Sequence, residues 1–239
     1  MHFTLTEGRA SAAAADVPLL VDDQGCLKHS FGSLLVATIL SRPTARKELL
    51  RQIGCECAAQ IEAARLICGE RLLTAIDGHI HVHMIPSIFS VVADAARDAG
   101  IPEIRISDEP FYVADPWRDL RQSFWWINLI KHLLMKAFSY RARVVARHNG
   151  LRTPGAFVGL LYSGRMTASR ALRGIEAAAD KDEVEVVFHI GRADIAEAKR
   201  WSRSGDINAN LSEWRDIERG ELCQLSEMLR AESRLQTSC

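Results

Sequence analysis

Three histidines occupy every second position from residue 79 to residue 83 in the segment 77–83, which reads DGHIHVH. In a β-strand successive side chains point to opposite faces, so the spacing predicts that His79, His81 and His83 share one face. The largely apolar residues 72–76 before them predict a buried strand, and ligands gather where such strands end in α/β proteins. Because neutral imidazole is the commonest protein ligand of transition metals, we expect a metal-dependent site here. A histidine-rich turn without a ligand is the alternative interpretation.

Two further residues whose side chains could take part in catalysis or binding lie in or directly after predicted strands. His189 follows the segment 184–188, and the near-neutral ordinary pKa of histidine suits a general acid or base. A structural histidine that caps a loop would show the same pattern. Arg105 lies between two isoleucines of another predicted strand. It could face an anionic or hydroxyl-rich substrate, or form an ion pair with Glu109.

The composition limits the class of protein and its compartment. Thirty basic and thirty acidic residues give a formal net charge of zero, which argues against a nucleic-acid partner bound by a strongly basic surface. Six cysteines are scattered along the chain and no secretory signal opens it, so we expect reduced thiols in the cytoplasm. Polar residues interrupt the apolar stretch 124–138, which predicts an amphipathic or buried helix rather than a membrane span. Peripheral membrane contact and a homodimer are both left open.

Predicted strands and helices alternate along the chain. Strands are expected at 3–6, 72–76, 103–106, 157–162 and 184–188. Helices are expected at 33–40, 45–68, 87–99, 116–148, 167–179 and 212–235. Pro43 separates the first two helices, and Gly100 followed by Pro102 ends the third. The alternation favours a parallel α/β sheet or barrel, and the lack of an internal repeat or linker favours a single domain over residues 1–239.

The histidine segment and its surroundings resemble the YdjC-like carbohydrate deacetylases. That family shows Asp-Ser-His-x-His-x-His-x-x-Pro, then a helix and Gly-Ile-Pro-x-x-Arg, and residues 77–105 follow this order. Residues 1–8 are similar to the family's Gly-x-His-x-x-Leu-Thr segment, and 184–189 to its strand that ends in His-Pro. Residues 219–222 resemble its Arg-x-x-Glu-Leu helix more loosely. The long tryptophan-containing helical insert and residues 159–167 are most similar to the hopanoid-biosynthesis-associated branch.

The resemblance implies a distorted TIM-like (β/α) barrel that removes N-acetyl groups from amino sugars with a divalent metal, which could be Mg, Zn, Co or Mn. It places the metal on His2 and His79 and a general acid on His189. The residues that it assigns to substrate binding or to orienting the ligands are His81, His83 and Arg105. The implied substrate is a small amino-sugar oligosaccharide or a glycolipid such as a glycosylated hopanoid.

The chain also departs from the family pattern. The family begins with a strand that carries Asp-Asp, whereas this sequence opens at the Gly-x-His segment. We therefore expect an N-terminally truncated barrel without one metal ligand and the usual base. Gly78 stands where the family has serine, and His-Ile-Gly replaces His-Pro at residue 189. The alternatives to a deacetylase are a catalytically inactive relic that binds a carbohydrate or a lipid head group, and a hydrolase that cleaves another bond with the same metal site.

Overall fold

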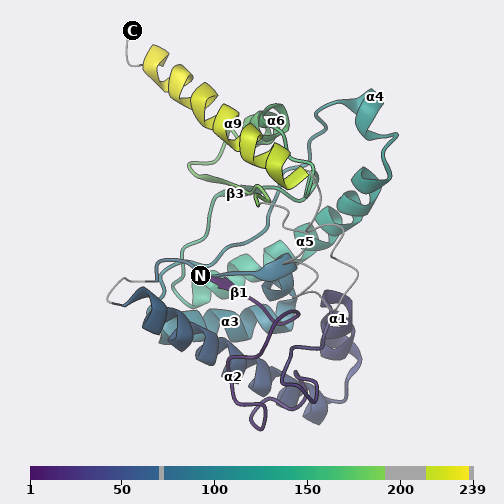
Figure 1. Cartoon of the computed structure of the whole chain (residues 1–239), viewed down its shortest axis with the longest axis vertical. Coiled ribbons are helices and arrows are strands. Elements are labelled where there is room, and N and C mark those ends of the chain that lie inside the picture. The colour runs from purple at the N-terminus through teal and green to yellow at the C-terminus, as the bar shows by residue number, and fades with distance from the viewer. Residues whose placement is uncertain (70–72, 192–213, 237–239) are drawn as a thin grey trace. The chain divides into compact units, whose positions relative to one another are not determined.

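The computed structural model describes residues 1–69, 73–191 and 214–236 (Figure 1). The chain divides into two compact units. The first unit comprises Met1–Ile106 and Ala137–Thr153, and the second comprises Ser107–Lys136 and Pro154–Cys239. Helix α5 (Ser123–His148) contributes its first half to the second unit and its second half to the first.

Three helices with clear sequence boundaries form most of the first unit. They are α1 (Phe31–Leu40), α2 (Pro43–Cys68) and α3 (Pro86–Asp98). Ser30 and Ser33 form a reciprocal capping box at the start of α1, which satisfies backbone N–H groups that have no partner within the helix. Proline occupies the first turn of α2 and of α3, where no backbone donor is needed. Helix α2 packs against α3, and both bury one apolar face in the core.

Short parallel strands link distant parts of the first unit. Strand β1 (His2–Phe3) pairs with β2 (Asp77–Gly78), so that His2 lies opposite Asp77 and Phe3 opposite Gly78. Two isolated parallel bridges continue this arrangement, from Ile76 to Ile104 and from Glu103 to Arg152. The backbone pairing therefore brings the start of the chain beside the histidine segment.

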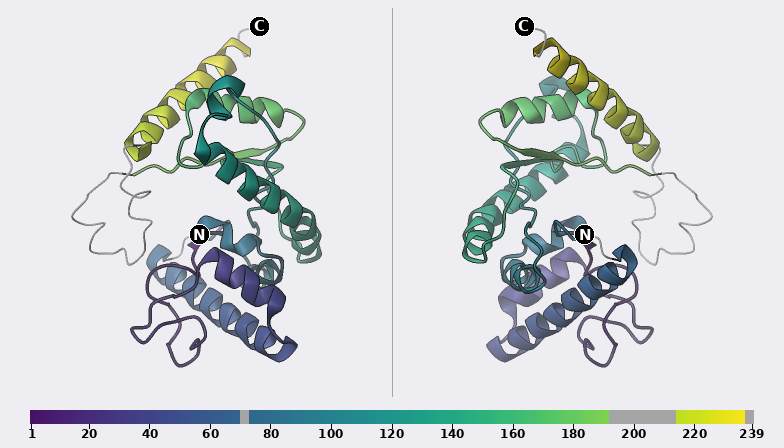
Figure 2. Two further views of the ribbon diagram at one scale, coloured as in Figure 1. Left: turned by 90° about the vertical axis from the view of Figure 1, so that its right-hand side faces the viewer. Right: turned by 90° about the vertical axis from the view of Figure 1, so that its left-hand side faces the viewer.

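The second unit contains a two-stranded parallel sheet and helices that cover it. Its strands are β3 (Ala156–Val158) and β4 (Val184–Val186), and its further helices are α4 (Pro116–Asp119), α6 (Ala168–Ala177) and α9 (Trp214–Gln236). Helix α6 packs against both β3 and α9 (Figure 2). Tyr162, Met166 and Leu225 belong to the apolar cluster that these elements enclose.

The structure confirms the mixed α/β class and corrects the length of most strands. The strand predicted at 157–162 ends at Val158, because the next three backbone N–H groups, of residues 159–161, donate to the buried carboxylate of Glu109 instead of to a neighbouring strand. Within the described ranges the named strands form two sheets of two strands, and neither sheet is closed. A barrel therefore stays a prediction, as does the single domain. Leu72 and the predicted helix start at Ser212 lie outside the described residues.

The predicted helices agree more closely with the structure than the strands do. The stretch 116–148 is helical, with a break between α4 and α5. No helix in the described part of the chain is both long enough and apolar enough to cross a membrane.

Candidate functional site

The pairing of β1 with β2 places two imidazoles and a carboxylate together in the first unit. The Nδ1 atom of His2 lies 2.7 Å from Oδ2 of Asp77. The Nε2 atom of His2 lies 3.3 Å from Nδ1 of His79, and the two rings meet edge to face with centroids 5.4 Å apart. Two of the residues expected to bind a metal thus lie side by side.

Asp77 determines which nitrogen of His2 carries the proton. Burial raises the pKa of Asp77, but the hydrogen bond from His2 and the positive charge of Arg105 outweigh burial and leave the pKa below its ordinary value. The carboxylate is therefore ionised at neutral pH and can only accept hydrogen bonds. It follows that Nδ1 of His2 donates to Asp77, and that the lone pair of a neutral His2 is on Nε2, which faces His79.

A carboxylate also lies beside His79, although no sequence pattern pointed to it. The Oε2 atom of Glu7 lies 3.5 Å from Nε2 of His79, a distance that is long for a hydrogen bond. Asp77 therefore orients His2 by a hydrogen bond, whereas Glu7 adds a carboxylate near the outer nitrogen of His79.

The distance between the two inner nitrogens can be compared with the spacing of ligands around a metal ion. With metal–nitrogen bonds of about 2.0–2.1 Å, two ligands of a tetrahedral ion are separated by about 3.3–3.4 Å. The separation of 3.3 Å between Nε2 of His2 and Nδ1 of His79 equals this value, and it also suits a direct hydrogen bond between the rings when one of the two nitrogens carries a proton. The described residues do not include a group of three His, Cys, Asp or Glu side chains able to hold a metal. Metal binding by His2 and His79 therefore stays a prediction.

The histidine segment is not the strand that its alternation predicts. Residues His79–Met84 form a short 3₁₀ helix, η1, in which Ile80 (φ 45°) and His81 (φ 59°) have left-handed backbone conformations. Such a conformation is unfavourable for a β-branched residue and costs on the order of 1–3 kcal/mol per residue, so surrounding packing must hold it. The three imidazoles consequently do not share one face. His81 is half-buried, and its role as a ligand-orienting or substrate-binding residue stays a prediction.

His83 is fully buried, which bears on its predicted role. Its Nε2 atom donates to the backbone oxygen of Arg105 at 3.0 Å, and burial lowers its pKa to about 4, so that the ring is neutral. The ring packs against Gly78, where an added Cβ atom would lie 2.5 Å from Nδ1 of His83. A glycine at residue 78 therefore makes room for His83. In this position His83 packs against Gly78 and the backbone of Arg105, and it cannot reach a substrate in solvent.

Arg105 forms an ion pair with Asp77, and an ion pair with Glu109 stays a prediction. The guanidinium contacts Oδ2 of Asp77, the same oxygen that accepts from His2. This contact explains how an arginine on a buried segment is neutralised, and it joins Arg105 to the metal-site residues. Whether the guanidinium also binds substrate stays a prediction.

His189 belongs to the second unit, where it follows β4. Its backbone N–H donates to the buried carboxylate of Glu218, and its Nδ1 atom lies 3.8 Å from Oε2 of the same residue. Burial raises the pKa of Glu218, and the bonds from the His189 and Met166 backbone partly offset this effect. Glu218 was not predicted from the sequence. The role of His189 as a general acid stays a prediction.

Comparisons with known proteins find similar sequences among proteins named as deacetylases. A carbohydrate deacetylase from Mus musculus is 30% identical over 184 residues, which are 74% of this chain and 54% of the mouse protein. A chitooligosaccharide deacetylase from Yersinia pestis (strain Pestoides F) is 36% identical over 102 residues, which are 43% of this chain and 36% of that protein. The chain thus spans about half the length of the mouse relative.

A solved structure and a family model extend the comparison to most of the chain. The crystal structure of a protein from Enterococcus faecalis V583, described as a "putative cellobiose-phosphate cleavage protein", matches with a TM-score of 0.54. The match covers 91% of this chain and 71% of that one at 18% identity, and it supports the fold alone. The model of the family described as YdjC-like protein matches residues 1–226, a range that includes His2, His79 and His189. This chain belongs to the YdjC-like family.

Proposed function

We propose that the protein is a metal-dependent hydrolase that removes N-acetyl groups from an amino-sugar substrate. The observation that carries the proposal is the pair of inner imidazole nitrogens of His2 and His79, 3.3 Å apart, with Asp77 hydrogen-bonded to the outer nitrogen of His2 and Glu7 near the outer nitrogen of His79. Family membership and the names of the carbohydrate and chitooligosaccharide deacetylases support the reaction class. The distorted barrel that the family resemblance implies belongs to the same proposal.

The residues of the site have distinct tasks in this proposal. His2 and His79 would hold the ion, and a bound divalent metal would supply the Lewis acidity that polarises the amide carbonyl and activates water. Asp77 keeps the lone pair of His2 directed at the ion, and Arg105 keeps Asp77 ionised. The family resemblance assigns to His189 the donation of a proton to the leaving amine. Imidazole ligands favour zinc or cobalt over magnesium among the candidate metals.

An exposed apolar face on α5 supports a lipid-linked substrate as the finer form of the proposal. Trp126, Ile130 and Leu133, spaced along one side of the helix in the second unit, are 50%, 70% and 58% exposed. Helix α5 contains five Lys or Arg residues and no Asp or Glu. An apolar face with basic flanks suits contact with an anionic membrane surface, where a glycosylated hopanoid would be found. A homodimer stays an untested alternative use of the same face.

A protein that binds its sugar or lipid head group without turnover is the second candidate. Besides the imidazoles of His2 and His79, the described residues provide no third protein ligand for a metal, and this observation favours the binding protein. The two candidates differ in two measurable properties. The enzyme releases acetate, whereas the binding protein retains its ligand after the loss of His79.

The test measures metal binding and acetate release separately. Isothermal titration with Zn²⁺ and Co²⁺ should give one site per chain, which the His79→Ala variant loses. Acetate release should be measured from N-acetylglucosamine oligomers and from an N-acetylated glycolipid in vesicles, with each metal added. Metal binding without acetate release from any substrate would favour the binding protein. If the His79→Ala variant kept both metal binding and acetate release, the proposed site would be refuted.

A further inference from the structure

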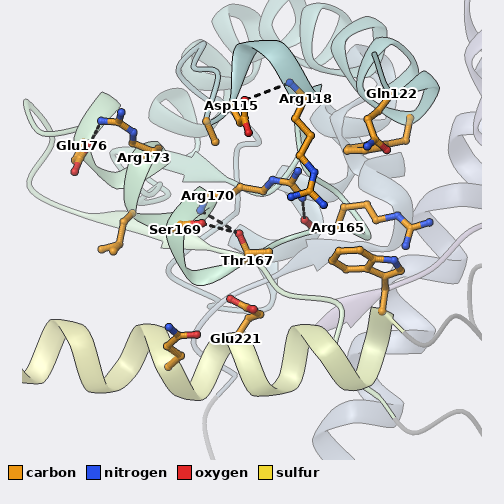
Figure 3. Close-up of a pocket in the computed structure, with 15 residues that line it drawn as sticks. Asp115, Arg118, Gln122, Arg165, Thr167, Ser169, Arg170, Arg173, Glu176 and Glu221 are labelled. Carbon is orange, nitrogen blue, oxygen red and sulfur yellow. Dashed lines mark hydrogen bonds and ion pairs between the residues drawn. The ribbon is translucent and has the colours of Figure 1, made fainter. Parts of the chain in front are cut away.

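A pocket of the second unit has nearly balanced charge and borders the start of α5. Four arginines and three carboxylates line this pocket between α4, α6 and α9 (Figure 3). A further carboxylate, that of Asp119, forms a buried ion pair with Arg170 at 3.0 Å. The pocket therefore does not indicate a charged ligand. Phe124, in the first turn of α5, also lines it, and the exposed side of that helix carries a clearer signal.

Helix α5 carries polar side chains inward and large apolar side chains outward. The inward side chains of Asn128, His132 and Ser139 are at most 5% exposed. Asn128 donates to the backbone oxygens of Leu161 and Ser163, each at 3.3 Å. The outward side shows apolar side chains that are 50% to 81% exposed: Trp126, Ile130, Leu133, Tyr140 and Val144. A helix that faces water has the opposite distribution, so we expect a partner on the outward side.

The outward residues follow the spacing of a coiled-coil seam. With the exposed Ala137 included, they occupy positions 126, 130, 133, 137, 140 and 144, at intervals of four, three, four, three and four residues. These intervals are those of the a and d positions of a heptad repeat, and we name the six residues the α5 seam. At a rise of about 1.5 Å per residue the seam is about 27 Å long. A stripe limited to a and d positions is narrower than the apolar face of a helix that packs on a broad apolar surface.

The amino end of the α5 seam presents apolar atoms to a partner. The indole N–H of Trp126 donates to the backbone oxygen of Leu120 at 3.0 Å. This bond satisfies the polar atom of the ring within the chain. The partner therefore does not have to supply an acceptor for Trp126.

The α5 seam is complementary to a second copy of itself when the two helices run antiparallel. Positions a of one copy then face positions d of the other, and each layer joins a larger side chain to a smaller one: Trp126 with Val144, Tyr140 with Ile130, and Leu133 with Ala137. Such alternation of large and small side chains fills the layers without voids. The two-fold axis repeats every contact, so the assembly closes as a dimer.

The charges on α5 also favour the antiparallel direction. The helix contains five Lys or Arg residues and no Asp or Glu. In a parallel pair each cation would lie near its own copy, and Arg147, at the next seam position, would meet its copy directly. In an antiparallel pair Arg147 lies opposite Ser123 instead. Lys136 approaches its own copy there, but its ammonium is already paired with the carboxylate of Asp108 at 2.5 Å.

We propose that two copies of this chain associate through the α5 seam as an antiparallel dimer. The dimer covers the exposed apolar face of α5, so contact of that face with a membrane is confined to the monomer. Neither metal binding nor acetate release enters the proposal.

Sedimentation velocity of the full chain over a range of concentrations measures the association. We expect a dimer, and Ile130→Asp should raise its dissociation constant about a hundredfold or more, because each copy would bury an unpaired charge. Ile39→Asp is the matched control, since this isoleucine of α1 is similarly exposed, at 61% against 70% for Ile130, but lies off the seam. The control should change the dissociation constant by less than about twofold. Circular dichroism checks that both variants are folded.

Oxidative cross-linking tests the direction of the two helices. The background carries serine in place of Cys68, Cys223 and Cys239. In it, the double variant Ile130→Cys/Tyr140→Cys should form a covalent dimer, because each position faces the other across the axis. The two positions are about 15 Å apart within one helix, so the disulfide must join two copies. Ile130→Cys alone should give no covalent dimer, since the two copies of residue 130 are also about 15 Å apart along the helix axes.

Three results would overturn the proposal. One is a chain that stays monomeric at every concentration, and another is an equal loss of the dimer in Ile130→Asp and Ile39→Asp. The third is a covalent dimer of Ile130→Cys alone, which would contradict the antiparallel arrangement. Co-sedimentation with vesicles of anionic lipid identifies the other occupant: a monomeric wild type whose vesicle binding Ile130→Asp abolishes would assign the face to a membrane instead.

Discussion

Replacement of Asp77 by asparagine tests the electrostatic arrangement of the metal-site residues. The carboxylate accepts a 2.7 Å hydrogen bond from His2 and an ion pair from Arg105 on one oxygen, and its side chain is 16% exposed. A hydrogen bond to a charged group contributes about 1.5–3 kcal/mol. Asparagine preserves the shape but leaves the guanidinium of Arg105, itself 19% exposed, without its ionised partner. Since both contacts are partly screened by solvent, we expect Asp77→Asn to lower the free energy of unfolding by about 2–3 kcal/mol.

The pH dependence of this loss identifies its cause. The pKa of Asp77 is lowered in the folded protein, so the stability from its ionised form is present above the ordinary value of 3.8 and disappears as the pH falls through the folded pKa. The difference between wild type and Asp77→Asn should therefore be complete at pH 7 and vanish in strong acid.

Urea unfolding followed by circular dichroism measures the difference in the free energy of unfolding between wild type and Asp77→Asn. Zn²⁺ titration of the same samples measures the change in zinc affinity. Loss of a partner that orients a metal-binding histidine weakens metal affinity by about 10–100-fold. The Arg105→Gln variant serves as the control for charge, because it also breaks the ion pair but leaves the bond between Asp77 and His2. An Asp77→Asn protein with unchanged unfolding energy and zinc affinity would refute the assignment of Asp77 as the residue that orients His2.

Three further predictions follow from other contacts. Gly78→Ala should lower the free energy of unfolding by about 1–3 kcal/mol, since the new Cβ would lie 2.5 Å from the buried ring of His83; urea unfolding that matches wild type would contradict the packing. Glu7→Gln should weaken zinc binding about tenfold in calorimetric titration, because the neutral amide holds the facing imidazole less firmly, and an unchanged affinity would remove Glu7 from the site. Glu109→Gln should destabilise the second unit by about 2–4 kcal/mol in thermal unfolding, since one buried carboxylate accepts three backbone N–H bonds from residues 159–161; a difference below about 0.5 kcal/mol would show that these bonds are dispensable.

The helices of the protein follow from local sequence, for a physical reason. Helix boundaries depend on residues within one turn, such as the Ser30 and Ser33 capping box and the proline that opens α2. The strands could not be predicted to the same accuracy. A strand ends where its backbone donors find other acceptors, and the acceptor that ends β3, the carboxylate of Glu109, lies about fifty residues away in the sequence.

The sequence by itself determined the family and pointed to His2 and His79 as candidate metal ligands, because the motif residues and their spacing are local. It also determined the mixed α/β class, through the alternation of apolar segments. Only the tertiary structure decided that Asp77 orients His2, that Glu7 lies beside His79, and that His83 turns into the core while His79 faces His2. The reason is that the parallel pairing of β1 with β2 joins residues 75 apart, and the left-handed turn at Ile80 and His81 cancels the alternation that the sequence displays.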